Sequence, residues 1–247
     1  MWFSRRIVGI LMLTSLLILT VAASVRAQAG SAAGSVTAIQ GKVTIVRGSR
    51  TLAAAYATPV LVGDQIGTAA NSRVTLTLSD GTQLELAESS TLTVVQNALN
   101  PDGSRAATAI NLLGGLLHSL VRFAPGNAPN YEVHTPNAVA AARGTNYDTD
   151  YVKEDRKGYK DCREFTDVAV YDGVVEVRNP GNPTAGTVTL KKGHKTTVPC
   201  GLLPTPPSTA ALISAGALGV AGAVAVGVTI PGAAGSFGGG EPVTPSR

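Results

Sequence analysis

Few residues in this chain could take part in chemistry, and their spacing does not assemble a reaction centre. Ser119 follows His118 directly, but adjacent residues on an extended strand point to opposite faces, so they cannot form a nucleophile and base pair there. The sequence has no Gly-x-Ser-x-Gly elbow, phosphate-binding loop or His-Glu-x-x-His metal motif. We therefore expect a protein without enzymatic activity and without catalytic residues.

Oxygen ligands for a metal ion are also present, in a short acidic stretch made of Asp148, Asp150, Glu154 and Asp155. Their spacing lacks the glycine-centred loop of a defined Ca²⁺ site. The histidines His118, His134 and His194 are scattered singly, and neither cysteine belongs to a Cys-x-x-Cys pair. The sequence therefore predicts neither a bound metal nor another cofactor.

The two cysteines, Cys162 and Cys200, favour a disulfide if the chain reaches an oxidising compartment. Such a bond would close a loop of about 40 residues and contribute about 3–4 kcal/mol on the chain-entropy model. Two free thiols in a reducing compartment are the alternative.

The N-terminus predicts export. Arg5 and Arg6 precede the apolar run 7–23, and small residues follow it, as in a secretory signal peptide. We place the signal peptide at residues 1–27 and the mature start near Gln28, with an uncleaved membrane anchor as the alternative. The protein should be periplasmic or extracellular.

Export changes how the charge is interpreted. The chain has 20 basic and 16 acidic residues, and the signal peptide removes three arginines and no acid, which leaves 17 basic residues. A nearly neutral mature chain gives no support for nucleic-acid binding, which needs a clustered basic face.

Short runs of alternating β-branched and apolar residues recur between glycine and polar turns, at residues 43–46, 73–78, 83–86, 91–94, 167–171, 174–177 and 187–190. This period of two is the strand pattern, and the segments between the runs keep no 3.6-residue period. The sequence predicts one all-β domain over residues 34–200, built as a stack of short strands and hairpins in a β-solenoid or a sandwich.

Two turns contain Asp-Gly, at Asp80-Gly81 and Asp172-Gly173. This pair is typical of two-residue type I′ hairpins, where both central residues have positive φ. A weak internal similarity, Val-x-x-x-x-Gly-x-Val, starts at Val36 and again at Val168, which suits repeated strand-turn-strand units.

Composition shifts after Cys200. Residues 201–209 are rich in proline and predict a linker, and 210–230 is an Ala/Gly/Val-rich apolar segment long enough to span a bilayer. A membrane contact or helix-packing role for 210–230 stands beside a flexible tail, and residues 231–247 are expected to be disordered.

Several motifs occur in an order that resembles the FecR domain, an extracytoplasmic signalling module. They are Val62-Gly-Asp-Gln-Ile66, Ser79-Asp-Gly-Thr82, Leu113-Gly-Gly-Leu116, Thr135-Pro136 with Ala138-Val139, Arg143-Gly-Thr145 and Asp172-Gly173. The resemblance covers about 34–198. It implies an all-β domain in signal relay or ligand sensing without catalysis.

In regulator-type relatives a cytoplasmic anti-sigma segment and a transmembrane helix precede the domain, whereas six residues precede the apolar run here. We therefore expect no direct control of a sigma factor by this chain. The hypothesis is a module that binds an envelope protein, polymer or small ligand. The alternative is a structural cell-envelope protein attached through 210–230.

The signature residues that could be structural or binding are Thr135, Pro136, Arg143, Gly144, Thr145, Asp64 and Asp80. Pro136 keeps Thr135 extended, and Gly144 would allow a backbone conformation forbidden to its neighbours. Arg143 stands among small apolar residues, and a partly buried guanidinium needs a carboxylate or several carbonyls. We expect Asp64 or Asp80 to be its partner in the scaffold, with a ligand-gripping arginine as the alternative.

Overall fold

The computed structural model describes residues 31–126, 128–181, 186–200 and 202–209. The expected signal peptide (1–27), apolar segment (210–230) and tail (231–247) lie outside these residues. The described part of the chain consists of strands and connecting turns, which confirms the predicted all-β class. In these residues no helix is long and apolar enough to cross a membrane.

The strands form two sheets that are joined through one long strand. Sheet A has the order β4 (Pro59–Leu61), β1 (Ala32–Gln40), β6 (Arg73–Leu78), β7 (Gln83–Leu86), β9 (Arg105–Val121), β12 (Thr145–Lys153), β13 (Glu164–Asp172), β16 (His194–Pro199) and β17 (Ser208–Thr209). Sheet B has the order β3 (Arg50–Ala53), β2 (Val43–Arg47), β5 (Gln65–Thr68), β8 (Thr91–Leu99), β9, β10 (Tyr131–His134), β11 (Val139–Ala142), β14 (Val174–Arg178) and β15 (Val188–Lys191).

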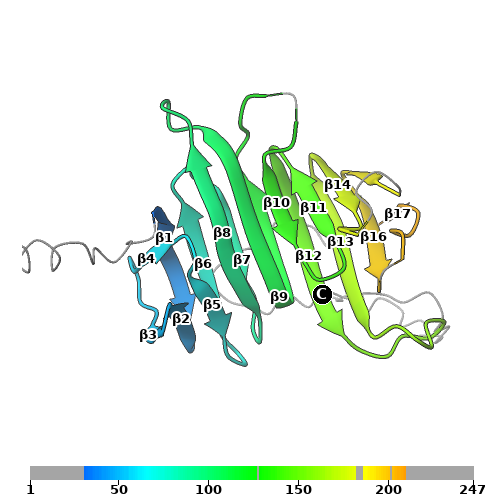
Figure 1. Ribbon diagram of the computed structural model, residues 1–247, viewed down its shortest axis with the longest axis horizontal. Coiled ribbons are helices and arrows are strands. Elements are labelled where there is room, and N and C mark those ends of the chain that lie inside the picture. The colour runs from blue at the N-terminus through cyan, green and yellow to red at the C-terminus, as the bar shows by residue number, and fades with distance from the viewer. Residues whose placement is uncertain (1–30, 127, 182–185, 201, 210–247) are drawn as a thin grey trace, which may run out of the picture. The chain divides into compact units, whose positions relative to one another are not determined.

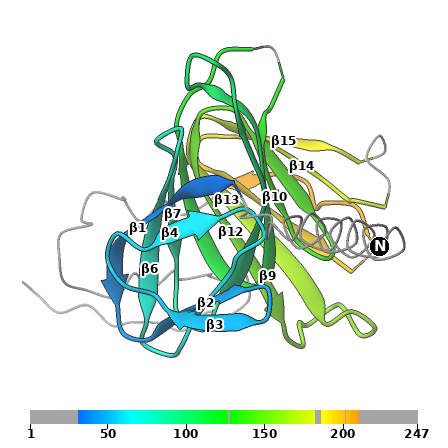
Figure 2. The same ribbon diagram turned by 60° about the vertical axis from the view of Figure 1, so that its left-hand side comes forward.

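Neighbouring strands pair antiparallel except β9 and β10, which are parallel. Figure 1 shows the strands following one another across the view from β1 to β17, and the turned view in Figure 2 shows β2 beside β3 and β14 beside β15. The chain thus adds hairpins alternately to the two sheets, as the predicted stack requires.

Within the strands, buried apolar side chains alternate with more exposed side chains, so each sheet has an inner and an outer face. In β6, for example, Val74, Leu76 and Leu78 are buried and the residues between them are partly exposed. Inward-facing residues of both sheets join in one hydrophobic cluster. Because each buried aliphatic side chain contributes about 1.5–3 kcal/mol, this shared core stabilises both sheets together.

Two connections from sheet A to sheet B contain a glycine at positive φ. Gly41 (φ 73°) connects β1 to β2, and Gly173 (φ 85°) connects β13 to β14. Val36 and Val168, each five residues before its glycine, are fully buried. The weak internal similarity therefore marks two equivalent crossings between the sheets.

The Gly-Gly pair of β9 makes the reverse crossing within a single strand. Residues 105–114 of β9 pair in sheet B, and residues 115–121 pair in sheet A. At this corner Gly115 has φ 81°, and a Cβ there would lie 2.0 Å from the Ser90 hydroxyl. Because of this corner the two ends of β9 lie close together, and Arg105 lies next to residue 122.

The predicted type I′ geometry is wrong for both Asp-Gly pairs. Gly81 has φ 85° but Asp80 does not have positive φ, and the Gly81 amide donates to the Leu78 carbonyl at 2.9 Å. The loop is thus a turn followed by a glycine bulge, because the Asp80 carboxylate accepts hydrogen bonds from Thr82. Asp172-Gly173 joins strands of different sheets and forms no hairpin.

The expected linker also departs from the prediction in its described part, 202–209. Thr205 donates its amide to the Thr197 carbonyl at 2.9 Å and accepts a hydrogen bond from Thr196 at 2.6 Å. Ser208 and Thr209 then form β17 against β16. These residues extend sheet A because their backbone groups find partners on its last long strand.

Candidate functional site

Arg105 is a charged residue in the interior of the described chain, and its side chain is 0% exposed. It forms an ion pair with Asp80, and it donates to the Thr82 hydroxyl at 2.9 Å and to Asn130 Oδ1 at 3.0 Å. Its Nη2 donates to the carbonyl oxygens of Arg122 and Arg143, each at 2.8 Å. All five guanidinium N–H groups are therefore satisfied, which a buried arginine requires.

The predicted partners of Arg143 are wrong. Asp80 is bound by Arg105, and Asp64 is fully buried and bound by Arg47, with Nε to Oδ1 at 2.8 Å and Nη2 to Oδ2 at 2.7 Å. Arg143 follows the last residue of β11, where the chain leaves sheet B, so its side chain reaches the surface. There its guanidinium lies 5.1 Å from the ring centroid of Phe123 and donates to the Gly126 carbonyl.

Gly144 is required for space. A Cβ on Gly144 would lie 2.8 Å from the Cα of Phe123, and a Cβ on Gly173 would lie 2.7 Å from the Gly144 carbonyl oxygen. Gly144 itself does not have positive φ, so the expected backbone role is wrong. Thr145 is buried and donates to the Val174 carbonyl at 3.0 Å, which links β12 of sheet A to β14 of sheet B.

The first residues of the signature tie the β10–β11 turn to sheet A. Thr135 and Asn137 are buried, whereas Pro136 is exposed. The Asn137 amide donates to the carbonyls of Glu164 (3.1 Å) and Val198 (2.7 Å), and the hydroxyls of Thr135 and Thr166 lie 2.7 Å apart. These residues hold the turn against β13 and β16.

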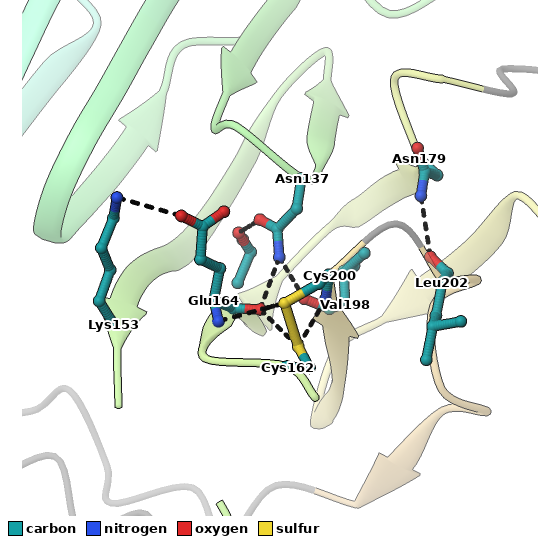
Figure 3. The surroundings of a disulfide bond; sticks show 9 residues. Asn137, Lys153, Cys162, Glu164, Asn179, Val198, Cys200 and Leu202 are labelled. Atoms are coloured by element: carbon teal, nitrogen blue, oxygen red, sulfur yellow. Dashed lines mark hydrogen bonds and ion pairs between the residues drawn. A yellow bond between two sulfur atoms is a disulfide. The ribbon is translucent and has the colours of Figure 1, made fainter. Parts of the chain in front are cut away.

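Figure 3 shows that this network lies beside the disulfide between Cys162 and Cys200. The bond confirms the predicted pairing, and Cys162 is buried. Asn137 and the disulfide therefore fasten the same two segments, one at the start of β13 and the other at the end of β16.

Strand β11 is buried on both faces, which explains its run of alanines. Ala140 and Ala142 belong to the core cluster, whereas Ala141 lies on the other face beside Glu132 of β10. Glu132 and Arg178, from the strands on either side of β11, form an ion pair of 2.9 Å across it. Hydrogen bonding from His134 and from Arg178 lowers the pKa of Glu132 to about 2.

His118 and Ser119 point to opposite faces, as predicted. Ser119 is fully buried and its hydroxyl lies 3.1 Å from the Tyr131 hydroxyl. On the outer face of sheet A, His118 Nδ1 lies 2.6 Å from Asp148 Oδ1, and the Tyr171 hydroxyl donates to Asp148 Oδ2 at 2.5 Å. Burial lowers the pKa of His118, but the hydrogen bond and the charge of Asp148, together with the charge of Glu85, outweigh burial, and the net shift is upward.

The same outer face carries a second acidic pair. Asp150 and Asp167 are cross-strand partners on β12 and β13, and Arg156 binds Asp167 at 2.6 Å. Desolvation, followed by repulsion from Asp167, raises the pKa of Asp150 to about 6. Across the described ranges, no three His, Cys, Asp or Glu side chains converge in a way that could hold a metal ion.

The surface above Arg105 is the candidate binding site, and we call Arg122, Phe123 and Arg143 the arginine end. Phe123 is 65% exposed. Among the described residues, no carboxylate forms an ion pair with Arg122 or Arg143. A cavity of about 220 Å³ adjoins this surface and is lined by Asp80, Asp102, Gly103, Ser104, Arg105, Arg122, Phe123 and Ala124.

The sequence reasoning did not identify Arg105, Asn137, Arg122 or Phe123. Arg105 escaped it because the pairing of β8 and β9 shifts register between Ala98 and Leu99. Ala107 pairs with Ala98 and Arg105 with Leu99, so a bulge turns Arg105 inward, out of phase with the period of two. Asn137 occupies the unspecified position of Thr-Pro-x-Ala and could have been noticed as a turn residue with a side-chain amide.

These features define a two-sheet β domain whose buried polar residues connect its sheets. Residues 64–176 match the family model described as FecR protein, so this segment of the chain is similar to a FecR domain. The FecR family is regulatory and not enzymatic. The matched segment is narrower than the 34–198 expected from the motifs, and it contains the whole Thr135–Thr145 signature.

Two crystal structures of a proposed anti-sigma factor from Parabacteroides distasonis ATCC 8503 are similar to this chain. Their sequence identities are 18% and 17% and their TM-scores 0.45 and 0.44. Each alignment covers 59% of this chain and 59% of the solved chain. No curated protein matches the sequence.

Proposed function

We propose that this protein is an exported, non-enzymatic FecR-type module that binds an envelope protein, polymer or small ligand in sensing or signal relay. The observation that carries the proposal is the FecR match over 64–176. Within the match, the polar signature residues Thr135 and Thr145 and the buried Arg105 hold the two sheets together. These residues serve as scaffold, which suits a domain that binds its partner through its surface.

The disulfide supports the exported location. Disulfides persist in oxidising compartments and are rare in the cytosol, and the Cys162–Cys200 bond links two segments of this domain. The proposal places the mature chain in the periplasm or outside the cell, starting near Gln28.

Fractionation of the native host tests the location. We expect a mature chain that begins near Gln28, with Cys162 and Cys200 oxidised in mass spectra recorded without reductant. A cytosolic chain with two free thiols would contradict export. If the mature chain stays in the membrane fraction after washing with alkaline carbonate, the alternative is favoured, a structural envelope protein attached through 210–230.

Transcript profiling tests the signalling role. Deletion of the gene and complementation with the intact chain should change, and then restore, the expression of a defined set of envelope genes. A deletion that leaves every transcript unchanged but alters envelope integrity would favour the structural alternative over signal relay.

A further inference from the structure

We propose that the arginine end is a docking surface for an acidic segment of a partner protein, with Arg122 and Arg143 each pairing with one carboxylate. This inference rests on the proposed function, because it names the chemistry of the partner that the module binds. Phe123, which follows Arg122 in the chain and packs against the guanidinium of Arg143, would contact an apolar side chain of the same segment.

The charge of the arginine end favours an acidic partner. Arg122 is exposed and Arg143 half-buried, and in the described chain neither has a carboxylate within ion-pair distance. In the described chain their guanidinium groups donate hydrogen bonds to carbonyl oxygens, from Arg122 to Asp80 at 3.4 Å and from Arg143 to Gly126. A guanidinium keeps donors for a further acceptor in such a setting, and its planar fork matches the two oxygens of a carboxylate, as it does those of a phosphate.

The backbone of the arginine end is preorganised. Nη2 of Arg105 donates to the main-chain oxygens of both Arg122 and Arg143, each at 2.8 Å. These two oxygens therefore cannot lie farther apart than twice 2.8 Å. The close approach of Gly144 to Phe123 fixes the backbone between them. A surface held in this way loses little conformational entropy when a partner binds.

The arginine end also has the composition of a protein interface. Phe123 is 65% exposed, and Val174, one position beyond the Ala142–Val175 pair on the adjacent strand, is 48% exposed. Aromatic residues and arginine are enriched among the residues that dominate binding energy in protein interfaces. The stacking of Arg143 on Phe123 supplies both in one place.

Other anionic occupants fit less well. Recognition of an anionic membrane takes a cluster of about 4–8 basic residues, and this surface has two arginines. Phosphate sites use free main-chain N–H groups, whereas the main-chain groups described at the centre of this surface are carbonyls already bound by Arg105. Asp102, at the edge of the adjoining cavity, would also repel a multiply charged phosphate.

The test uses the ¹⁵N-labelled mature chain and the arginine Nε–Hε resonances in NMR titrations to about 20 mM probe. The probe is the blocked peptide Gly-Glu-Leu-Glu-Gly, and its matched control is Gly-Gln-Leu-Gln-Gly. We expect saturable shifts at Arg122 and Arg143 with the first peptide only. Arg122→Ala and Arg143→Ala should each weaken binding about threefold to tenfold, and the double variant should abolish it.

Arg50→Ala is the matched control, since Arg50 is an exposed arginine on the edge strand β3, and it should leave binding unchanged. Asp102→Asn should strengthen binding about twofold by removing a like charge. Thermal unfolding verifies that each variant is folded. If Arg143→Ala unfolds, Arg143→Gln replaces it because an amide can still donate to the Gly126 carbonyl.

Three results would overturn the proposal: equal binding of the two peptides, equal loss in Arg50→Ala, or no shift at the highest probe concentration. Tighter binding of inorganic phosphate, or of vesicles of phosphatidylglycerol and phosphatidylcholine, at the same two arginines would also overturn it. A chain that is exported and changes envelope transcripts but fails these titrations would leave the proposed function intact and remove this surface as the docking site.

Discussion

The guanidinium of Arg105 donates a hydrogen bond of 2.8 Å to the main-chain carbonyl of Arg143. The first arginine is fully buried and the second reaches the surface. The buried arginine thus positions the half-buried one, and the scaffold role expected of Arg143 belongs to Arg105.

Arg105→Met should lower the free energy of unfolding by about 3–5 kcal/mol, because it leaves the Asp80 carboxylate buried and unpaired. Arg143→Met should cost less than about 1 kcal/mol, since its contacts are at the surface. Urea denaturation at pH 7 measures both. Equal losses in the two variants would contradict the scaffold role of Arg105.

Gly144→Ala should destabilise the domain by about 1–3 kcal/mol, because the new Cβ would overlap the Phe123 backbone. Gly114→Ala is the matched control: nothing lies within 4 Å of a Cβ there, so its effect should stay within about 0.5 kcal/mol. The pair is compared by thermal unfolding. A neutral Gly144→Ala would show that the approach of the two segments is looser than described.

Asn137→Ala should cost about 2–3 kcal/mol, because the carbonyls of Glu164 and Val198 lose their donor in a buried site. Asn111→Ala on β9 serves as the comparison, since Asn111 is only half-buried and should change stability little. Urea titrations that rank Asn111→Ala as the more damaging change would refute this assignment.

Replacement of Cys162 and Cys200 by serine should lower the stability by about 3–4 kcal/mol on the chain-entropy model, because the bond closes a loop with a sequence separation of 38. The wild-type chain in reductant should unfold at the same urea concentration as the double variant. A reduced wild-type protein as stable as the oxidised one would show that the Asn137 network alone holds these strands.

Asp150→Asn should stabilise the protein by about 1 kcal/mol at pH 7. The pKa of Asp150 rises from 3.8 when unfolded to about 6 when folded, so the folded state holds the proton more tightly. The loss of stability caused by ionised Asp150 is therefore absent below pH 4, grows as the pH rises from 4 to 6, and is complete above pH 6. Urea denaturation between pH 3.5 and 7.5 measures it. Asp172→Asn, at an exposed carboxylate, should give a flat difference.

Local patterns in the sequence account for most of the fold. The alternation in β6, β8 and β14 survived in the structure because a strand with one face in a core must alternate. The disulfide was predictable because an exported chain with two cysteines has one intramolecular pairing to make. The Asp80 turn was predicted with the wrong geometry, because its carboxylate bonds to Thr82 and Arg105 instead of serving the turn alone.

The sequence by itself determined the strand class, the cysteine pair, the separation of His118 from Ser119 and the segment in which the signature lies, since these depend on neighbours along the chain. Only the tertiary structure decided which arginine is buried, which carboxylates it meets and why Gly144 is a glycine. Those features depend on the register shift in β9 and on the crossing at Gly114-Gly115, which bring residues 105 and 122, at the two ends of β9, together with residue 143 after β11.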